Sequence, residues 1–345
     1  MKLSLYRVHL PLAHPFTISR GTITTQPSLI VELQHDGATG LGEVTENAFY
    51  GHSFDSITES IRQATPLLAR YETHPPQELW SELMSAVSGD TFAASAVDMA
   101  AHDLWSRLQA QPTWQSWDLT WAQVPESSFT IGIDHIETMV QKLQEQPGWN
   151  IYKIKLGTDQ DLDIVTELRR HTSAVFRVDA NCGWTVDQTI EYSAVLKDLG
   201  VEFIEQPLPL NATDHDRKRV CENSHLPIIA DENCQRPEDV GRCHGRFHGV
   251  NVKICKCGGL TPALSMLREA RSLGMKTMVG CMVESSVGIS GAAQLLPLLD
   301  YADLDGAVLL RDEPCSGVVV AKGLVHLTVN NGTGAVLHRD RLAEF

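Results

Sequence analysis

Short runs of β-branched and other apolar residues alternate with longer segments of helical periodicity from about residue 128 onward. After the first run, apolar residues recur at the spacing of one helix face, at Ile136, Met139, Val140 and Leu143. Such alternation is typical of βα units that build a parallel sheet. The predicted strands are Phe129–Ile133, Tyr152–Leu156, Phe176–Asp179, Val201–Glu205, Ile228–Asp231, Val250–Ile254, Thr277–Met282 and Tyr301–Asp305.

Eight strands with crossovers of this length predict an α/β barrel over residues 125–311. This span is short for eight complete βα units, which is compatible with a missing helix after the last strand. Residues 1–124 predict a separate α+β module, and we expect residues 312–345 to run back and complete it. One helix of this module has an apolar face at Val97, Ala101, Leu104, Trp105 and Leu108. Its predicted strands cover Leu3–Leu10, Ser28–Leu33 and Gly40–Val44.

The composition is that of a folded globular protein, since 43% of the 345 residues are hydrophobic and 21% are charged. There are 28 Lys and Arg against 43 Asp and Glu, a formal net charge of −15. This charge repels phosphate backbones and anionic lipid headgroups, so we expect neither nucleic acid nor a membrane as partner. Apolar runs are shorter than the roughly 20 residues that span a bilayer, and Arg7, His9 and His14 interrupt the first one, which favours a cytoplasmic protein.

The eight cysteines include no Cys-x-x-Cys pair, so neither a zinc site nor a redox motif is indicated. We expect reduced thiols that act as small apolar side chains. Cys243 with His244 and His248 is the one cluster that resembles a metal site, and we expect it to be a loop.

Charged residues end five successive predicted strands. Because barrel active sites are built at the carboxyl ends of the strands, side chains repeated once per βα unit form a ring in space. The ring is predicted to contain Lys155, Asp179, Glu205, Asp231 and Lys253.

Three carboxylates from adjacent strands, Asp179, Glu205 and Asp231, repel one another when unpaired. A hard divalent cation relieves this repulsion, and ligands that are all oxygen suit Mg²⁺, with Mn²⁺ as the other candidate. Any one of the three alone is better explained as a helix cap or surface ion pair, but their equal spacing favours the metal.

Lys153 and Lys155 lie two residues apart on one predicted strand and so point to the same face. Lys253, four strands further on, faces Lys155 across the barrel. Burial, a second ammonium and a metal ion each lower the pKa of a lysine toward the range useful for a base. A carbanion held between Lys155 and Lys253 can lose a proton to one lysine and regain one from the other.

Asp303 and Asp305 repeat the alternation on the last predicted strand, without an evident protein cation nearby. Two carboxylates on one face can bind a substrate ammonium group. Helix capping or salt bridging is the alternative explanation.

These residues stand in motifs that together resemble the enolase superfamily, in its muconate lactonizing enzyme subgroup. The resemblance covers nearly the whole chain, and two later motifs, Gly-Cys-Met-Val-Glu-Ser at 280–285 and Asp-Leu-Asp-Gly at 303–306, look most like dipeptide epimerases. The other motifs are Gly-Leu-Gly-Glu at 40–43, Lys-Ile-Lys at 153–155, Asp-Ala-Asn at 179–181, Glu-Gln-Pro at 205–207, Asp-Glu at 231–232 and Val-Lys-Ile-x-Lys-x-Gly-Gly at 252–259.

The resemblance implies a modified TIM barrel, (β/α)₇β, with an α+β capping domain. It implies that Asp179, Glu205 and Asp231 bind Mg²⁺, which grips the α-carboxylate of a dipeptide. Lys155 and Lys253 are then the opposed acid/base pair. The remaining implied roles are stabilisation of the enediolate by Lys153 and binding of the dipeptide ammonium by Asp303 and Asp305.

Two loops of the capping domain, Phe16–Thr24 and Glu46–His52, are expected to cover the substrate side chain. Some glutamate-selective relatives place an arginine in the first loop, where Arg20 stands nearby. If Arg20 points to solvent instead, an apolar pocket favours a hydrophobic dipeptide. Its expected lining is Ile18, Ile23, Phe49 and Tyr50.

Other reactions of the subgroup stay open: cycloisomerisation, o-succinylbenzoate synthesis and N-acyl amino acid racemisation. Their substrates offer no ammonium group to Asp303 and Asp305. Sugar-acid dehydration ranks lower because it usually employs a His/Asp dyad where this chain has Lys253. A catalytically silent peptide-binding relative is the non-enzyme alternative. A homo-oligomer is compatible with the sequence, which does not define the oligomeric state.

Overall fold

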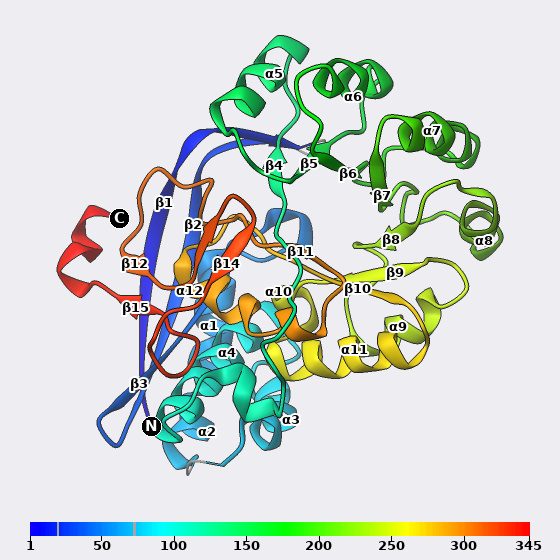
Figure 1. The fold of residues 1–345 in the computed structure, drawn as a ribbon. Coiled ribbons are helices and arrows are strands. Elements are labelled where there is room, and N and C mark those ends of the chain that lie inside the picture. The colour runs from blue at the N-terminus through cyan, green and yellow to red at the C-terminus, as the bar shows by residue number, and fades with distance from the viewer. Residues whose placement is uncertain (19–20, 72–73) are drawn as a thin grey trace.

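The structure of the protein, a computed structural model, describes residues 1–18, 21–71 and 74–345. Eight parallel strands form one sheet in which neighbours in sequence are neighbours in space (Figure 1). A parallel bridge between Ser127 and Ala302 brings the first strand beside the last, which closes the sheet into a barrel. The strands are β4 (Phe129–Ile131), β5 (Ile151–Lys155), β6 (Val175–Asp179), β7 (Val201–Glu205), β8 (Ile228–Ala230), β9 (Gly249–Val252), β10 (Lys276–Gly280) and β11 (Tyr301–Asp303).

Each of the eight predicted strands overlaps one of these strands, so the predicted barrel is confirmed. Helices follow β4 to β10 on the outside of the sheet, whereas no α-helix follows β11 in the described part of the chain, as the (β/α)₇β fold requires. The helices are α5 (Ile136–Glu145), α6 (Asp161–Arg169), α7 (Val186–Asp198), α8 (Asp214–Asn223), α9 (Pro237–Cys243), α10 (Ile254–Cys257), α11 (Leu260–Ser272) and α12 (Ser286–Ala293), with the 3₁₀ turn η3 (Leu296–Leu298).

The prediction that Cys243 lies in a loop is wrong. Cys243 is the last residue of α9 and is buried together with Val240, because this short helix packs one apolar face against the barrel. His248 lies beyond the helix, and its Nδ1 accepts a hydrogen bond from the Ile228 backbone N–H at 3.0 Å. The cluster therefore serves packing and backbone pairing.

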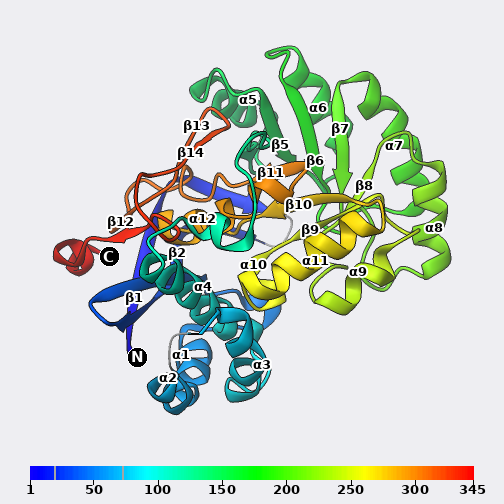
Figure 2. The same cartoon turned by 60° about the horizontal axis from the view of Figure 1, so that its bottom comes forward.

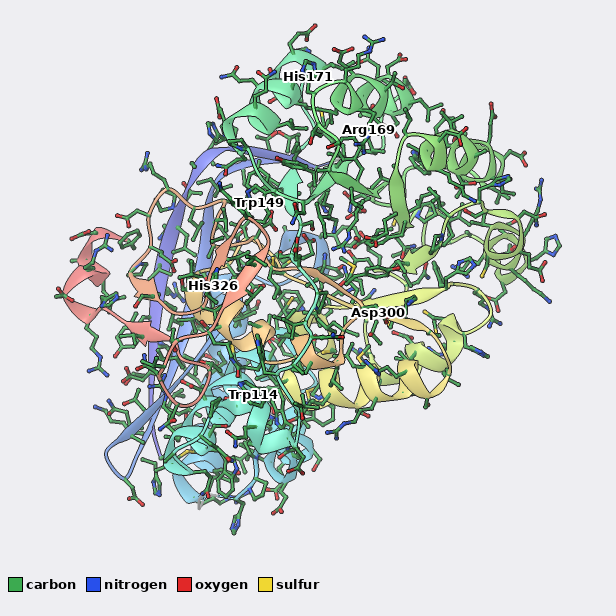
Figure 3. The ribbon with its side chains drawn as sticks, in the orientation of Figure 1. Trp114, Trp149, Arg169, His171, Asp300 and His326 are labelled. Atoms are coloured by element: carbon green, nitrogen blue, oxygen red, sulfur yellow. The ribbon has the colours of Figure 1, made fainter. Side chains whose placement is uncertain are left out.

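The amino-terminal end of the barrel interior is filled by side chains. Arg177 is buried inside the barrel, where its guanidinium lies over the Phe203 ring and donates to the Ala302 carbonyl at 2.9 Å. The packing around Arg177 leaves the opposite, carboxyl-terminal end of the interior as the open one. Outside the barrel, Arg169 at the carboxyl end of α6 (Figure 3) stacks over Phe176 at 3.8 Å and donates to the Leu199 carbonyl at 2.7 Å.

A second layer, which we call the cap, lies beside the barrel (Figure 2). Its antiparallel sheet packs against helices with an apolar core of its own. The elements are β1 (Lys2–Ile18), β2 (Gly21–His35), β3 (Ala38–Thr45), η1 (Ala48–Tyr50), α1 (Phe54–Gln63), α2 (Thr65–Arg70), α3 (Pro76–Ala86), α4 (Thr91–Leu108) and η2 (Thr113–Trp117).

Helix α4 joins the two layers. The sequence predicts one buried face, but α4 is buried on nearly all sides because the cap sheet covers one side and α10 and α11 cover the other. Gly42 permits the close approach of β3, since a Cβ there would collide with the Ala96 carbonyl oxygen. The cap and barrel are thus packed through a shared helix.

The C-terminal segment returns to the cap, as expected. Phe345 accepts a hydrogen bond from the His9 backbone N–H at 2.7 Å, and Arg339 pairs with Glu32 of β2. The division of the chain at residues 124/125 and 311/312 stays a prediction. The elements of the segment are β12 (Cys315–Ser316), β13 (Val319–Ala321), β14 (Leu324–His326), β15 (Val336–Leu337) and η4 (Arg339–Glu344). No helix in the described residues has the length and apolar character needed to cross a bilayer.

Candidate active site and metal centre

The predicted ring of charges is present at the carboxyl ends of the strands. Lys155, Asp179 and Glu205 end β5, β6 and β7 and pair in register across the sheet. Asp231 and Lys253 directly follow β8 and β9. All five side chains are buried. The regular βα spacing predicted their place at this end of the barrel but could not establish their burial.

The three carboxylates form a compact cluster. One oxygen from each of Asp179, Glu205 and Asp231 lies within 4.8 Å of the others, and this is the one such group of possible metal ligands found in the described residues. Burial and then the neighbouring Asp179 raise the pKa of Glu205 to about 7, so the cluster favours additional positive charge. An all-oxygen ligand set of this size fits a hard divalent cation.

Lys153 lies among the carboxylates of Asp179, Glu205 and Asp303. Its Nζ is 2.7 Å from Glu205 Oε2, 3.4 Å from Asp179 Oδ2 and 2.8 Å from Asp303 Oδ2. Burial alone lowers the pKa of Lys153, but these carboxylates outweigh it and raise the pKa well above its ordinary value. Lys153 is therefore a fixed cation.

The two outer lysines are also ion-paired. Lys155 Nζ lies 2.7 Å from Asp179 Oδ2, and Lys253 Nζ lies 2.9 Å from Asp231 Oδ2. The expectation that burial and neighbouring ammonium groups lower the lysine pKa does not hold for Lys253. Burial acts in that direction, but Asp231 raises the pKa of Lys253 well above its ordinary value.

Asp303 and Asp305 are not equivalent. The prediction that no protein cation lies near this pair is wrong for Asp303, because Lys153 contacts it and, against the effect of burial, holds its pKa at about 2. Asp305 accepts a hydrogen bond from the Thr130 backbone N–H at 2.6 Å and has no ion pair among the described residues. Burial, and then Asp303, raise the pKa of Asp305 to about 7.

A cavity of about 370 Å³ joins these groups to the cap. Lys155, Lys253, Asp303 and Asp305 line it from the barrel side. β5 and β9 lie four strands apart in an eight-stranded barrel, so the two lysines approach the cavity from opposite sides. The predicted cover of this cavity is present, since the cap contributes Ile18, Ile23, Phe49 and Tyr50 to its lining. Arg20 lies outside the described residues.

Sequence reasoning gave no role to three polar residues around the carboxylates, although two of them, Asn181 and Lys256, stand in the motifs quoted above. Asn251 Nδ2 donates to Glu205 Oε1 at 2.7 Å, and Lys256 holds Asp231 through its carboxylate and its carbonyl oxygen. Asn181 lines the cavity in a left-handed conformation with a φ of 44°. Asn251 and Asn181 each lie two residues from a ring member, on the same strand or its extension. Because residues two apart on a strand point to the same face, this spacing could have predicted them.

A barrel with clustered carboxylates and opposed lysines at its carboxyl end, beside an α+β cap, has the organisation that the sequence resemblance implied. The family model described as "Mandelate racemase / muconate lactonizing enzyme, N-terminal domain" matches residues 2–116. The model described as "Enolase C-terminal domain-like" matches residues 135–341. The chain belongs to the enolase superfamily, in its mandelate racemase/muconate lactonizing enzyme family.

Within this family the chain is similar to dipeptide epimerases. It is 48% identical over 337 residues to the L-Ala-D/L-amino acid epimerase of Flavobacterium johnsoniae, covering 98% of this chain and 100% of the relative. It is 37% identical over 338 residues to the L-Ala-D/L-Glu epimerase of Bacteroides thetaiotaomicron, covering 97% and 88%.

Solved structures of dipeptide epimerases share the fold. The dipeptide epimerase of Cytophaga hutchinsonii, complexed with Mg and the dipeptide D-Ala-L-Val, has a TM-score of 0.92 at 25% identity, covering 99% of this chain and 97% of that one. The substrate-liganded L-Ala-D/L-Glu epimerase of Bacillus subtilis has a TM-score of 0.92 at 26% identity, covering 97% and 98%.

Proposed function

We propose that this protein is a dipeptide epimerase that inverts the α-carbon of the C-terminal residue of an L,L-dipeptide. The observation that carries the proposal is the shared cavity. Lys155 and Lys253 enter it from opposite sides, above three clustered carboxylates, with Asp303 and Asp305 in the same lining. Two bases on opposite faces of one carbon are what inversion by proton transfer requires.

Asp179, Glu205 and Asp231 would hold the metal, which we propose to be Mg²⁺, with Mn²⁺ as an alternative. When bound, the metal supplies positive charge to the substrate carboxylate, where negative charge develops as the α-proton leaves. Lys153, fixed between Glu205 and Asp303, adds a permanent positive charge at the same place.

Lys155 and Lys253 carry the proton transfer. One Nζ takes the proton from the α-carbon, and the Nζ on the opposite side gives a proton to the other face. Each lysine is paired with a carboxylate of the metal cluster, Asp179 for Lys155 and Asp231 for Lys253. Because Asp179 and Asp231 would also hold the metal, their ion pairs with Lys155 and Lys253 would be weaker in the loaded protein.

Asp305 is the group best placed to bind the free amino group of a dipeptide. It lines the cavity and, within the described ranges, has no ion-pair partner of its own. N-acylated and dicarboxylic substrates carry no such cation. This observation ranks dipeptide epimerisation above the N-acyl amino acid racemase, cycloisomerase and o-succinylbenzoate synthase reactions. A cytoplasmic location and a homo-oligomeric state stay predictions.

The test is α-proton exchange. The purified protein is incubated with Mg²⁺ and pooled L,L-dipeptides in deuterium oxide, and the mass of each dipeptide is followed. We expect a gain of one mass unit that EDTA or the double substitution Lys155→Ala/Lys253→Ala abolishes. Lys276→Ala is the control, because Lys276 pairs with Asp300 outside the cavity.

Chiral chromatography of the same samples shows whether exchange is accompanied by inversion. Exchange on N-acyl amino acids instead of dipeptides would replace this proposal with the racemase reaction. Binding of dipeptides without any exchange would identify a catalytically silent relative.

A further inference from the structure

The start of α12 contacts a carboxylate of the cap. α12 starts at Ser286, shortly after the segment Cys281–Val283 that lines the cavity. Glu43, on β3 of the cap, is buried and reaches this helix start. Its Oε1 accepts the Ser285 backbone N–H at 3.0 Å, and its Oε2 accepts the Gly288 backbone N–H at 2.9 Å.

Both oxygens of Glu43 are saturated by donors. Oε1 also accepts the Ser28 hydroxyl at 2.6 Å, and Oε2 also accepts the Ser285 hydroxyl. No ion pair to Glu43 occurs in the parts of the chain that the structure describes. Hydroxyl and backbone N–H donors therefore stabilise this carboxylate. The start of a helix favours such an anion because its free N–H groups and the helix dipole are positive there.

The other N–H groups at the start of α12 are satisfied by the C-terminal segment and by the helix start itself. Glu313 accepts the Ser286 N–H at 2.6 Å, and the Ser285 hydroxyl oxygen accepts the Val287 N–H at 3.1 Å. Glu43 is therefore the contribution of the cap sheet to the start of this barrel helix, next to that of Glu313 from the C-terminal segment.

The segment Cys281–Val283, which forms one wall of the cavity, is held by few other hydrogen bonds. The Cys281 N–H donates to the Asp303 carbonyl at 3.0 Å, and the Met282 N–H donates to Glu284 at 2.9 Å. Burial, and then the neighbouring Glu43, raise the pKa of Glu284 to about 8. Because Ser285 is only two residues from Val283 in the chain, a shift of Ser285 should also move Val283 and Met282.

We propose that Glu43 is a positioning residue through which the cap fixes the Cys281–Val283 wall of the substrate cavity. The inference rests on the proposed function and extends it. Because both carboxylate oxygens accept a backbone N–H, glutamine cannot replace glutamate: its Nε2 would face an N–H group in either orientation. Glu43→Gln therefore displaces the helix start without changing the size of the side chain.

The experiment compares Glu43→Gln with Glu32→Gln. Glu32 is a buried carboxylate of the same sheet, but it pairs with Arg339 of the C-terminal segment and does not line the cavity. For Glu43→Gln we expect a rise in dipeptide KM of about tenfold, less than a threefold change in kcat and an unchanged Mg²⁺ Kd by calorimetry. For Glu32→Gln we expect a similar fall in Tm and an unchanged KM.

A structural role alone predicts that both variants lose Tm and neither changes KM, and that result would overturn the proposal. If Glu43→Gln does not fold, Ser28→Ala replaces it, since it removes the Ser28 hydroxyl donor to Glu43 and leaves both the charge and the N-cap of α12 in place. We expect it to raise KM about threefold, and an unchanged KM would again count against Glu43.

Hydrogen exchange separates this proposal from the proposed function. Without substrate, Glu43→Gln should speed amide exchange in peptides covering 281–290 and leave those covering β5 and β6 unchanged. If the wild-type protein exchanges no dipeptide α-proton, the proposed function fails, but this comparison still decides whether Glu43 holds the wall. Equal exchange in wild type and variant would show that it does not.

Discussion

Lys153 and Asp303 are in contact inside the barrel, with Nζ and Oδ2 2.8 Å apart, although they are 150 residues apart in the chain. The same ammonium reaches Glu205, so it links the carboxylate cluster to the aspartate pair. Asp303 is thereby committed to a protein cation, whereas Asp305 is not. Neutral substitutions of the two aspartates should therefore have different effects on dipeptide binding and Mg²⁺ binding.

Asp305→Asn should weaken the binding of dipeptides with a free amino group. Removing one member of a buried charge pair costs at least about 2 kcal/mol, which corresponds to a KM about 30-fold higher. The fold should be retained, because the Asn oxygen can still accept the Thr130 N–H. Steady-state kinetics with L-Ala-L-Phe and its N-acetyl form check this, and the acetylated dipeptide should be insensitive to the substitution.

Asp303→Asn is the comparison variant. It removes the counter-charge of Lys153 and so should also weaken Mg²⁺ binding, which calorimetry measures. Identical behaviour of Asp303→Asn and Asp305→Asn would contradict the distinct roles given to the two residues.

The substrate side chain should be apolar. Ile18, Ile23 and Tyr50 line the cavity from the cap, and Glu46 adds a carboxylate to the same lining. A glutamate side chain would meet this charge, so we expect kcat/KM for L-Ala-L-Phe to exceed that for L-Ala-L-Glu by at least about tenfold, or about 1.4 kcal/mol. A preference for L-Ala-L-Glu would contradict this and would direct the next substitution to Arg20.

The charged ring was predictable because each member ends or directly follows a strand and the βα unit repeats at a regular length. Lys155, Asp179 and Glu205 follow from that periodicity alone. Contacts that depend on how distant elements pack do not. The Lys153–Asp303 contact needs the closure of the barrel, and Glu43 meets Ser285 across 242 residues only because β3 packs on α12.

Asn251 should tune the metal centre without binding the metal. Its Nδ2 donates to Glu205 Oε1 at 2.7 Å in a fully buried position and so fixes the direction of that carboxylate. Loss of such an outer hydrogen bond typically costs 10- to 100-fold in metal affinity, roughly 1.4 to 2.7 kcal/mol. We expect a loss in this range for Asn251→Ala, measured as Mg²⁺ Kd by calorimetry.

Asn150→Ala is the matched control for Asn251→Ala. Asn150 makes the same type of bond, Nδ2 to Glu126 Oε2 at 2.9 Å, but on the exposed surface. Its removal should leave the Mg²⁺ Kd unchanged. An unchanged Kd in Asn251→Ala as well would mean that Glu205 is oriented without Asn251.

Asp98 should make the stability of the cap–barrel junction depend on pH. This fully buried carboxyl on α4 accepts the Thr261 N–H at 2.9 Å and the Thr261 hydroxyl at 2.7 Å at the start of α11. Burial raises its pKa to about 7, while the facing His102, with a pKa lowered by burial to about 3, stays neutral. Between about pH 4 and 7 the folded protein therefore binds a proton at Asp98 that the unfolded chain has released.

Because the folded state holds the extra proton, the contribution of Asp98 to the free energy of unfolding should fall as pH rises from about 4 to 7, by at most about 1.4 kcal/mol per pH unit, and level off above. His102 contributes with the opposite sign in both proteins. Asp98→Asn resembles the protonated acid and should lack this contribution. Urea unfolding of both proteins at pH 5 and pH 8 isolates it, since the other titrating groups cancel in the difference. The wild type should lose more stability than Asp98→Asn between the two pH values. An equal loss would mean that Asp98 is already ionised in the folded protein at pH 5, with the Thr261 donors stabilising its charge.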